Sequence, residues 1–299
     1  MYDVIVIGGG PAGLSAALML GRCRRRVLMC DLGEPRNRQS TALHGYLTRD
    51  GISPTEFNEL GRAELTRYGV ECRHAGVTGV VDTGSQYVAT LSTGGKETAR
   101  YLLIATGVVD DLPAIPGFHD CYGRCVFHCP YCDGWEQRDK KLAAFGVGAA
   151  VTGLALGLIT WSRDVIVLTH GARLDRRARA RLDRNGVGVQ EAEIERLEHD
   201  NGHLRVIAFA DGARLERDAL FFTTGQHPQS PIAIALGCQL TSKGTVNTSS
   251  RCETNVARVF VAGDASRDAQ FVVVAAAEGV KAAAISRTNA SSASAAARS

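Results

Sequence analysis

The chain has 299 residues, 45% of them hydrophobic and 22% charged, and a formal net charge of +3. This composition excludes disordered, collagen-like and coiled-coil proteins, and the length suggests about two domains. The net charge is too small to indicate a nucleic-acid partner, because such proteins carry a concentrated basic face. No apolar run reaches the roughly 18 residues of a membrane span, and the apolar start lacks a basic n-region. We therefore expect a cytoplasmic protein without a membrane partner.

The nine cysteines are an odd number, in a chain too long to need a disulfide framework. In a reducing compartment most of them should be free thiols, and any disulfide should be catalytic rather than structural. Five of them are scattered along the chain, and we expect them to be buried like small apolar residues. They are Cys23, Cys30, Cys72, Cys238 and Cys252.

The first part of the chain alternates apolar strands with an Ala/Leu-rich helical segment. Residues 3–7 and 26–31 are short apolar runs typical of buried parallel strands, with a helix between them. Residues 101–107 form another such strand, which ends in glycine. The proline- and glycine-containing segment at 112–117 predicts a linker.

A second copy of this pattern follows the expected linker. Residues 141–150 repeat the strand, glycines and helix start, 164–171 repeat the second strand, and 219–228 resemble 101–107. Two such units in tandem predict an α/β protein. The five arginines within 176–184 predict a solvated helix face. A last strand at 258–264 ends in Gly-Asp before an apolar helix.

Gly8, Gly10 and Gly13 form a G-x-G-x-x-G pattern directly after the first strand and at the start of a helix. These glycines allow, in turn, a tight turn, a close approach of the backbone to a pyrophosphate, and close packing of helix on strand. Asp31 ends the second strand, where a carboxylate can bind ribose hydroxyls. Together these features predict a cofactor that contains ADP, in preference to a structural turn.

Cys129 and Cys132 form a C-x-x-C motif, whose spacing places both sulfurs on one side of a helical first turn. A helix N-terminus lowers the pKa of a thiol there, so the motif predicts a redox-active disulfide. Metal binding and inert thiols are the alternatives. With Cys121 and Cys125 the spacing is unlike that of a zinc ribbon, although Cys125 and the C-x-x-C pair match the radical-SAM pattern. We expect no metal, and the role of Cys121 and Cys125 stays open.

The motifs together resemble the low-molecular-weight thioredoxin reductase family of FAD-dependent disulfide oxidoreductases, most closely through GRCVFHCPYCDGWE at 123–136. The resemblance covers essentially the entire chain. It implies two Rossmann-like three-layer (ββα) dinucleotide-binding domains. Residues 1–113 and 246–299 would form a discontinuous FAD domain, and 114–245 an inserted central NAD(P)H-like domain with the C-x-x-C motif. It also implies a homodimer.

The resemblance also implies roles for individual residues. Cys132 would face the flavin, Cys129 would exchange with the substrate, and Asp133 would move the proton. His128 is either a second acid or base or a half-buried histidine. Residues 36–51 resemble a second FAD-contact loop, with a polar surface loop as the alternative. The expected FAD contacts are Gly8, Gly10, Pro11, Ala12, Gly13, Asp31, Arg36, Asn37, His44, Gly45, Val77, Ala105, Thr106, Gly107, Gly263, Asp264, Gln270, Phe271 and Val272.

The second glycine motif departs from the family pattern. It keeps Gly146 and Gly148 but has the β-branched Val151 at the third position. The following strand ends in Thr169–Gly171, with neither an arginine pair for NADP nor an acid for NAD. Losing one charge-assisted phosphate contact removes about 1.5–3 kcal/mol. We therefore predict poor NADPH selectivity, which makes NADP(H) a doubtful second cofactor.

This departure is found in a branch of the family that acts as dithiol oxidases, which close disulfides in natural products of the gliotoxin, holomycin or romidepsin kind. We predict such an oxidase, with a small-molecule dithiol as substrate and oxygen as acceptor. Against it stands Asp133, where several oxidases carry His. One alternative is a disulfide reductase that uses NADPH or another donor and acts on thioredoxin or a small disulfide. The other is a non-enzymatic flavin redox sensor.

Overall fold

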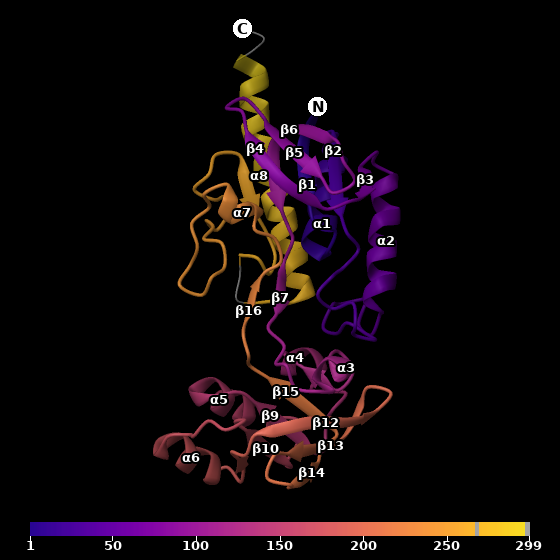
Figure 1. The fold of residues 1–299 in the computed structure, drawn as a ribbon. Helices are drawn as coiled ribbons and strands as arrows, with labels where there is room; N and C mark the ends of the chain where they lie inside the picture. The colour runs from indigo at the N-terminus through magenta and orange to yellow at the C-terminus, as the bar shows by residue number, and fades with distance from the viewer. Residues whose placement is uncertain (267–268, 297–299) are drawn as a thin grey trace. The chain divides into compact units, whose positions relative to one another are not determined.

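The computed structural model describes residues 1–266 and 269–296, with side chains to residue 284 (Figure 1). The chain divides into two compact units. The first comprises Met1–Arg38, Gly45–Val109 and the chain from Gln226 onward, and the second Gln39–His44 and Asp110–Gly225. The sequence-based division resumed the first domain at 246, after this boundary. None of the described helices has the length and apolar character needed to span a membrane.

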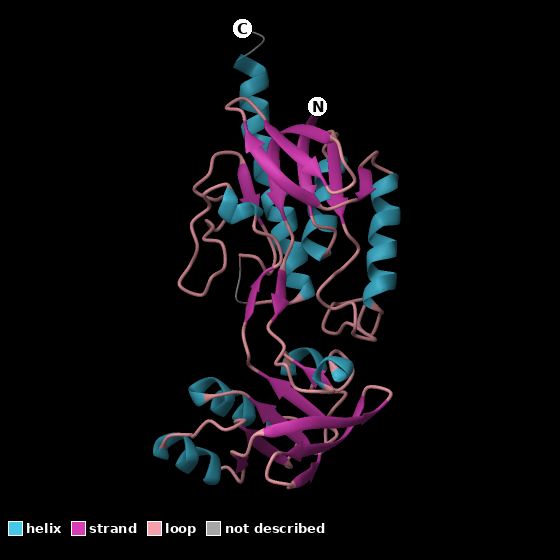
Figure 2. Cartoon of the chain, in the orientation of Figure 1, coloured by secondary structure: helices cyan, strands magenta, loops and turns pink. Residues whose placement is uncertain are grey.

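The elements of the first unit are β1 (Tyr2–Ile7), α1 (Pro11–Arg22), β2 (Val27–Asp31), α2 (Pro54–Thr66), β3 (Glu71–His74), β4 (Val77–Asp82), β5 (Tyr87–Leu91), β6 (Lys96–Ile104), α7 (Ile232–Ala235), β17 (Val259–Val261) and α8 (Val272–Ala296). The main sheet has the order β3-β2-β1-β6-β5-β4, and β17 also pairs with β6. β1 pairs in parallel with β2 and β6, while β4, β5 and β6 are antiparallel (Figure 2).

The central strand β1 is buried on both faces, because its successive side chains enter two different cores. Val4 and Val6 pack in one core with residues of α1 and α8, and Ile5 and Ile7 pack in the other with residues of β5. These layers confirm the predicted three-layer arrangement. The carboxyl ends of β1 and β6 lie side by side, since Ile7 pairs with Ile104.

The elements of the second unit are α3 (Phe118–Cys121), β8 (Val126–Phe127), α4 (Pro130–Asp133), β9 (Leu142–Phe145), α5 (Gly148–Leu158), β10 (Val165–Leu168), α6 (Arg176–Asp183), β11 (Gly188–Gln190), β12 (Ile194–Asp200), β13 (His203–Phe209), β14 (Arg214–Glu216) and β15 (Ala219–Phe222). The parallel sheet has the order β11-β10-β9-β15-β8, and β12, β13 and β14 form an antiparallel sheet. The segments β7 (Val108–Asp110) and β16 (Gln226–Pro228) pair with each other.

Two expectations from the sequence are wrong. The predicted linker at 112–117 packs into the second unit, where Ile115 is buried in the core and Pro116 accepts a hydrogen bond from the Leu197 amide. Cys72 is exposed, because β3 is an edge strand of the first sheet. Cys23 is half-buried, and the other three scattered cysteines are buried as expected. The arginine-rich segment is the exposed helix α6.

Candidate active site

The first glycine motif is packed too tightly for side chains at two of its positions. A Cβ atom on Gly13 would lie 1.9 Å from the carbonyl oxygen of Gly8, and one on Gly8 would lie 2.4 Å from the carbonyl oxygen of Ala105. Gly10, in contrast, faces open space. The motif therefore brings α1 against β1 and leaves its middle glycine open to an incoming group.

The N-terminus of α1 has the features of an anion-binding site. Its N-cap is Gly10, which provides no side-chain hydrogen bond, and Pro11 and Ala12 follow in the first turn. The first amide groups of a helix have no intrahelical partners, and the helix dipole favours negative charge beside them. The open space at Gly10 and these amides together fit a pyrophosphate.

Asp31 stands at the end of β2, beside the glycine turn. A Cβ atom on Gly9 would lie 2.6 Å from its carboxylate. Arg62 of α2 forms an ion pair with Asp31. Sequence reasoning placed Asp31 but missed Arg62, because an arginine on a helix gives no local signal of the partner it reaches.

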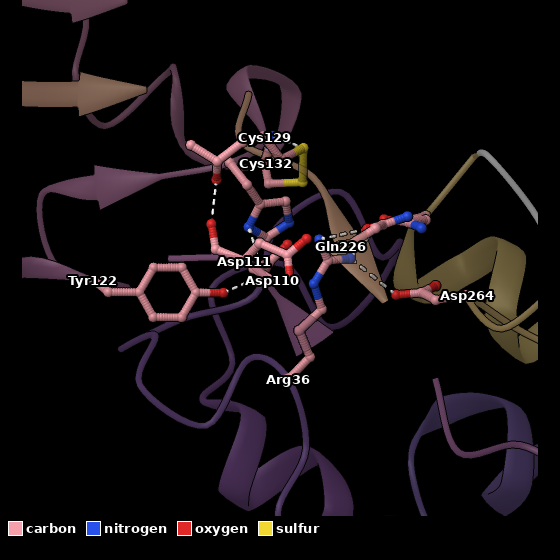
Figure 3. A network of polar contacts seen from close by, with 11 residues as sticks. Arg36, Asp110, Asp111, Tyr122, Cys129, Cys132, Gln226 and Asp264 are labelled. Carbon is pink, nitrogen blue, oxygen red and sulfur yellow. Dashed lines mark hydrogen bonds and ion pairs between the residues drawn. A yellow bond between two sulfur atoms is a disulfide. The ribbon is translucent and has the colours of Figure 1, made fainter. Parts of the chain in front are cut away.

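Arg36 binds two other predicted FAD contacts in the first unit. Its guanidinium donates to the Asp264 carboxylate at 3.2 Å and to Gln270 Oε1 at 2.6 Å (Figure 3). It also donates to Gln226 Oε1 at 3.2 Å, a residue that the sequence did not single out. Among the described residues, Gln270 Nε2 is a buried donor without a partner. An unpaired amide, an arginine and a helix N-terminus in one unit fit the phosphates and polar groups of FAD.

The remaining predicted contacts lie at loops and strand ends of the same unit, except His44. The Gly107 carbonyl accepts from the Gln229 amide, Gly45 donates its amide to Asp50, and the Gly263 amide donates to the buried carboxylate of Glu278 at 2.9 Å. Asn37 follows Arg36 in a turn, Thr106 lies in the segment after β6, and Val77 begins β4. Phe271 directly precedes α8, which begins at Val272. Their contacts with FAD stay predictions.

The C-x-x-C pair of the second unit forms a disulfide. Cys129 is the N-cap of the short helix α4, and Cys132 lies within that helix, with 5.3 Å between the two Cα atoms (Figure 3). Cys129 Sγ also accepts a hydrogen bond of 3.2 Å from the Cys132 amide. Both residues are half-buried, so the sulfurs are held in place while remaining within reach of solvent.

Asp133 follows Cys132 directly. Burial raises the pKa of its carboxyl group to about 7, and the nearby His44 partly offsets this rise. An acid with a pKa near 7 can give up and take back a proton at neutral pH, as a general acid must.

His128 precedes Cys129 and lies against a buried carboxylate. Its Nδ1 atom is 3.8 Å from Asp110 Oδ2, and the Asp110 side chain is only 4% exposed. The hydroxyl of Tyr122 donates to the same carboxylate oxygen (Figure 3). The structure thus holds a half-buried His128 beside a carboxylate, and its role as an acid or base stays a prediction. Sequence reasoning missed Asp110 and Tyr122.

The chain matches known proteins over almost its entire length. Residues 2–279 match the pyridine nucleotide-disulphide oxidoreductase family. A protein of Arthroderma benhamiae named "Probable thioredoxin reductase" is 33% identical over 89% of this chain and 74% of its own length. The thioredoxin reductase sirT of Leptosphaeria maculans is 31% identical over 94% and 92%. The crystal structure of HlmI has 35% identity and a TM-score of 0.93, covering 99% of this chain and 96% of HlmI.

The chain belongs to the pyridine nucleotide-disulphide oxidoreductase family. It is a thioredoxin reductase-like flavoprotein that binds FAD and acts as a disulfide oxidoreductase. FAD supplies the capacity to take up or deliver an electron pair. The residues that would hold it are those of the first glycine motif, Asp31 and the Arg36 network.

Cys121 and Cys125 are part of the hydrophobic core of the second unit. Both are buried, and Cys125 Sγ lies 2.9 Å from the Gly202 carbonyl oxygen and accepts from the Leu204 amide at 3.1 Å. A hydrogen bond with Cys125, together with burial, raises the pKa of the Cys121 thiol. Among the described residues, no group of three His, Cys, Asp or Glu side chains is placed to hold a metal ion.

The second glycine motif keeps the turn but differs in packing. Val151 is fully buried in the core of the second unit, so the third position accommodates a β-branched side chain. Gly148 faces open space, while a Cβ atom on Gly146 would lie 2.3 Å from Thr223 Oγ1. After β10, His170 Nδ1 accepts a hydrogen bond from the Ile194 amide. His170 is thus tied into the fold on the side of that nitrogen.

Proposed function

We propose that this flavoprotein is a dithiol oxidase that closes a disulfide in a small molecule, with oxygen as the final acceptor. The observation that supports it best is the second glycine motif. The fold of the central unit is intact, yet the residues after β10 are Thr169, His170 and Gly171, and the single Arg173 that follows Ala172 is not an arginine pair for a 2′-phosphate. A protein that takes electrons from its substrate does not need a selective NADPH site.

The proposed reaction begins at the Cys129–Cys132 disulfide. A substrate thiolate attacks Cys129 Sγ, forms a mixed disulfide and releases the Cys132 thiolate. The second substrate thiolate then attacks the substrate sulfur of that bond and releases Cys129, so that the substrate leaves as a disulfide. When bound, FAD supplies the route by which the electron pair and two protons of the Cys129–Cys132 dithiol pass to oxygen, giving hydrogen peroxide.

Two groups of the second unit are placed to handle the protons. Asp133 follows the leaving thiolate of Cys132 and holds a proton near neutral pH, because burial raises its pKa to about 7. His128 stands beside Cys129 and is oriented by Asp110. We propose that Asp133 protonates Cys132 and that His128 exchanges protons with substrate thiols at Cys129.

Helix α4 and the turns that follow it carry exposed aromatic groups beside the disulfide. Tyr131, between the two cysteines, is 78% exposed, and Trp135 is 64% exposed. Tyr131 meets Trp161 edge-on at 5.8 Å, and the Arg138 guanidinium lies 4.3 Å from the Trp135 ring centre. Exposed rings of this kind bind planar apolar groups. We propose that they hold the substrate while its thiols react.

The alternative is a disulfide reductase that works in the opposite direction. The relatives reported above favour it, because two of them bear the name thioredoxin reductase. Asp133 also follows the reductase pattern. In that case a nicotinamide or other donor would reduce the flavin, and thioredoxin or a small disulfide would be the acceptor. For either direction we propose a cytoplasmic homodimer.

Oxygen uptake and peroxide formation with dithiothreitol and other small dithiols test the oxidase. We expect turnover that depends on dithiol, one peroxide per dithiol oxidised, and a loss of at least about a hundredfold in Cys129→Ser. A parallel anaerobic titration with NADPH and NADH should bleach the flavin slowly or not at all. Rapid bleaching by NADPH, without dithiol-dependent oxygen uptake, would establish the reductase instead. Unchanged turnover in Cys129→Ser would contradict both.

A further inference from the structure

A short segment from the first half of the chain belongs to the second unit. Residues Gln39–His44 are part of that unit, although the residues on either side of them are part of the first. A Cβ atom on Gly123 would lie 2.8 Å from the carbonyl carbon of Gln39, and Leu43 is buried. The segment is therefore anchored at both ends, and it presents His44 to the region that follows the C-x-x-C motif.

His44 meets an acidic side chain there. Its Nε2 atom lies 3.6 Å from Glu136 Oε1, and the two side chains are 21% and 38% exposed. Glu136 follows Asp133 by three residues, on the turns that continue α4. Charges that are only partly exposed are screened less than fully solvated ones, so this pair can act on a neighbouring carboxyl group.

The two members of the pair act on Asp133 in opposite directions. In its protonated form His44 favours the carboxylate of Asp133 and lowers its pKa, while the negative charge of Glu136 raises it. Among the described residues, these are the charged side chains whose fields act on Asp133. Burial has the larger effect on the pKa of Asp133, and the charges of His44 and Glu136 act in addition to it.

We propose that His44 and Glu136 form a charge pair that controls the proton on Asp133, with His44 favouring its release and Glu136 favouring its retention. Both are positioning residues, since they act through Asp133. The inference rests on the proposed function, in which Asp133 protonates the leaving Cys132. A residue expected to contact FAD would then serve the disulfide instead.

The test measures, in the absence of oxygen and with dithiothreitol in excess over FAD, how fast dithiothreitol reduces the Cys129–Cys132 disulfide in the FAD-loaded protein between about pH 5 and pH 9. Alkylation and mass spectrometry report the reduced fraction without reference to turnover. The variants are His44→Gln, Glu136→Gln and Asp133→Asn. Glu216→Gln is the matched control, because Glu216 pairs with Lys141 in the same unit. Each rate is divided by the fraction of dithiothreitol present as thiolate at the same pH, which cancels the ionisation of the reductant.

We expect the rate to fall as Asp133 loses its proton. His44→Gln should move the midpoint of this fall up by about one pH unit, and Glu136→Gln should move it down by a similar amount. Asp133→Asn should abolish the midpoint. Shifts of opposite sign support the pair, because a purely structural role would move both midpoints in the same direction or neither.

Two results would overturn the inference. If both glutamine variants fold, as melting and FAD content report, and their profiles overlie the control or shift together, the pair does not control Asp133. The proposed function then survives. If dithiothreitol does not reduce the disulfide of the wild-type protein, the proposed function fails and this inference fails with it. Should His44→Gln not fold, the sign of the shift in Glu136→Gln decides alone.

Discussion

The two glycine motifs of this protein share a scaffold and differ in what surrounds it. In the first unit, Gly13 lies against the Gly8 carbonyl so closely that no side chain fits, and a carboxylate ends the following strand. In the second unit the same position is Val151, which is fully buried, and the following strand leads to His170. Both motifs form a strand, a turn and a helix.

The difference shows that folding and ligand recognition place separate demands on such a motif. A strand–turn–helix forms with either glycine or valine at the third position, since the helix can be held closer or further away. Recognition of a charged cofactor depends on the end of the second strand, where Asp31 stands in one unit and His170 in the other. We propose that the first unit meets both demands and that the second meets only the demand of folding.

Adding a methyl group at Gly13 tests whether the first motif requires its close packing of helix on strand. Gly13→Ala places a Cβ atom 1.9 Å from the Gly8 carbonyl oxygen, so α1 must move away from β1. We expect a loss of about 3 kcal/mol in the free energy of unfolding and purification without bound FAD. Flavin absorbance and urea denaturation measure both. Gly10→Ala is the control, since open space at that position should leave the stability of the apoprotein nearly unchanged.

The reverse change tests the second motif. Val151→Ala removes two buried methyl groups from the core of the second unit, which should lower the free energy of unfolding by about 2 kcal/mol. The FAD content should stay that of the wild type, because the change lies in the other unit. Parallel loss of FAD would show that the two motifs are not independent.

A substitution that adds a phosphate contact tests whether the second motif lacks only the charge needed to bind NADPH. His170 and Gly171 have positive φ angles of 48° and 88°, so an arginine is better placed at Ala172. Ala172→Arg should raise the affinity for NADPH about tenfold, or about 1.4 kcal/mol, and leave that for NADH unchanged. Fluorescence titration of both nucleotides measures this. Tight NADPH binding by the wild-type protein would instead show that the second motif already has a phosphate site.

The last prediction concerns the dependence of stability on pH. Because burial raises the pKa of Asp133 from 3.8 to about 7, the folded state binds this proton more tightly than the unfolded state. The contribution is complete below about pH 4 and is lost as the pH rises through about 7. Relative to Asp133→Asn, the wild type should lose unfolding free energy steadily between these two pH values. Equal pH profiles of the two proteins would contradict the burial of this carboxyl group.

Much of the fold followed from local sequence patterns. The strands at 3–7, 26–31 and 101–107 and their second copies correspond to strands of the structure, because short apolar runs beside glycine report burial directly. The prediction of a linker at 112–117 was wrong, because the pattern used for it does not report burial. Proline and glycine mark a turn, but they do not show that Ile115 beside them packs into a core.

The candidate site was predictable where its residues are close in sequence. Cys129, Cys132 and Asp133 belong to one short motif that is visible in the sequence. Arg62 and Gln226, in contrast, reach their partners from distant segments of the chain. Asp110 is a similar case, since its contact with His128 depends on how β7 leads into the second unit. Such partners are set by tertiary structure, and no local pattern marks them.

The excursion of residues 39–44 into the second unit has a topological consequence. With it, the chain passes between the two units at four places: after Arg38, after His44, after Val109 and after Gly225. An excised fragment of residues 110–225 would therefore lack a segment that packs in this unit and that includes Leu43 and His44. Whoever wishes to study the disulfide-bearing unit by itself must supply this hexapeptide, either grafted by a short loop or added as a separate peptide.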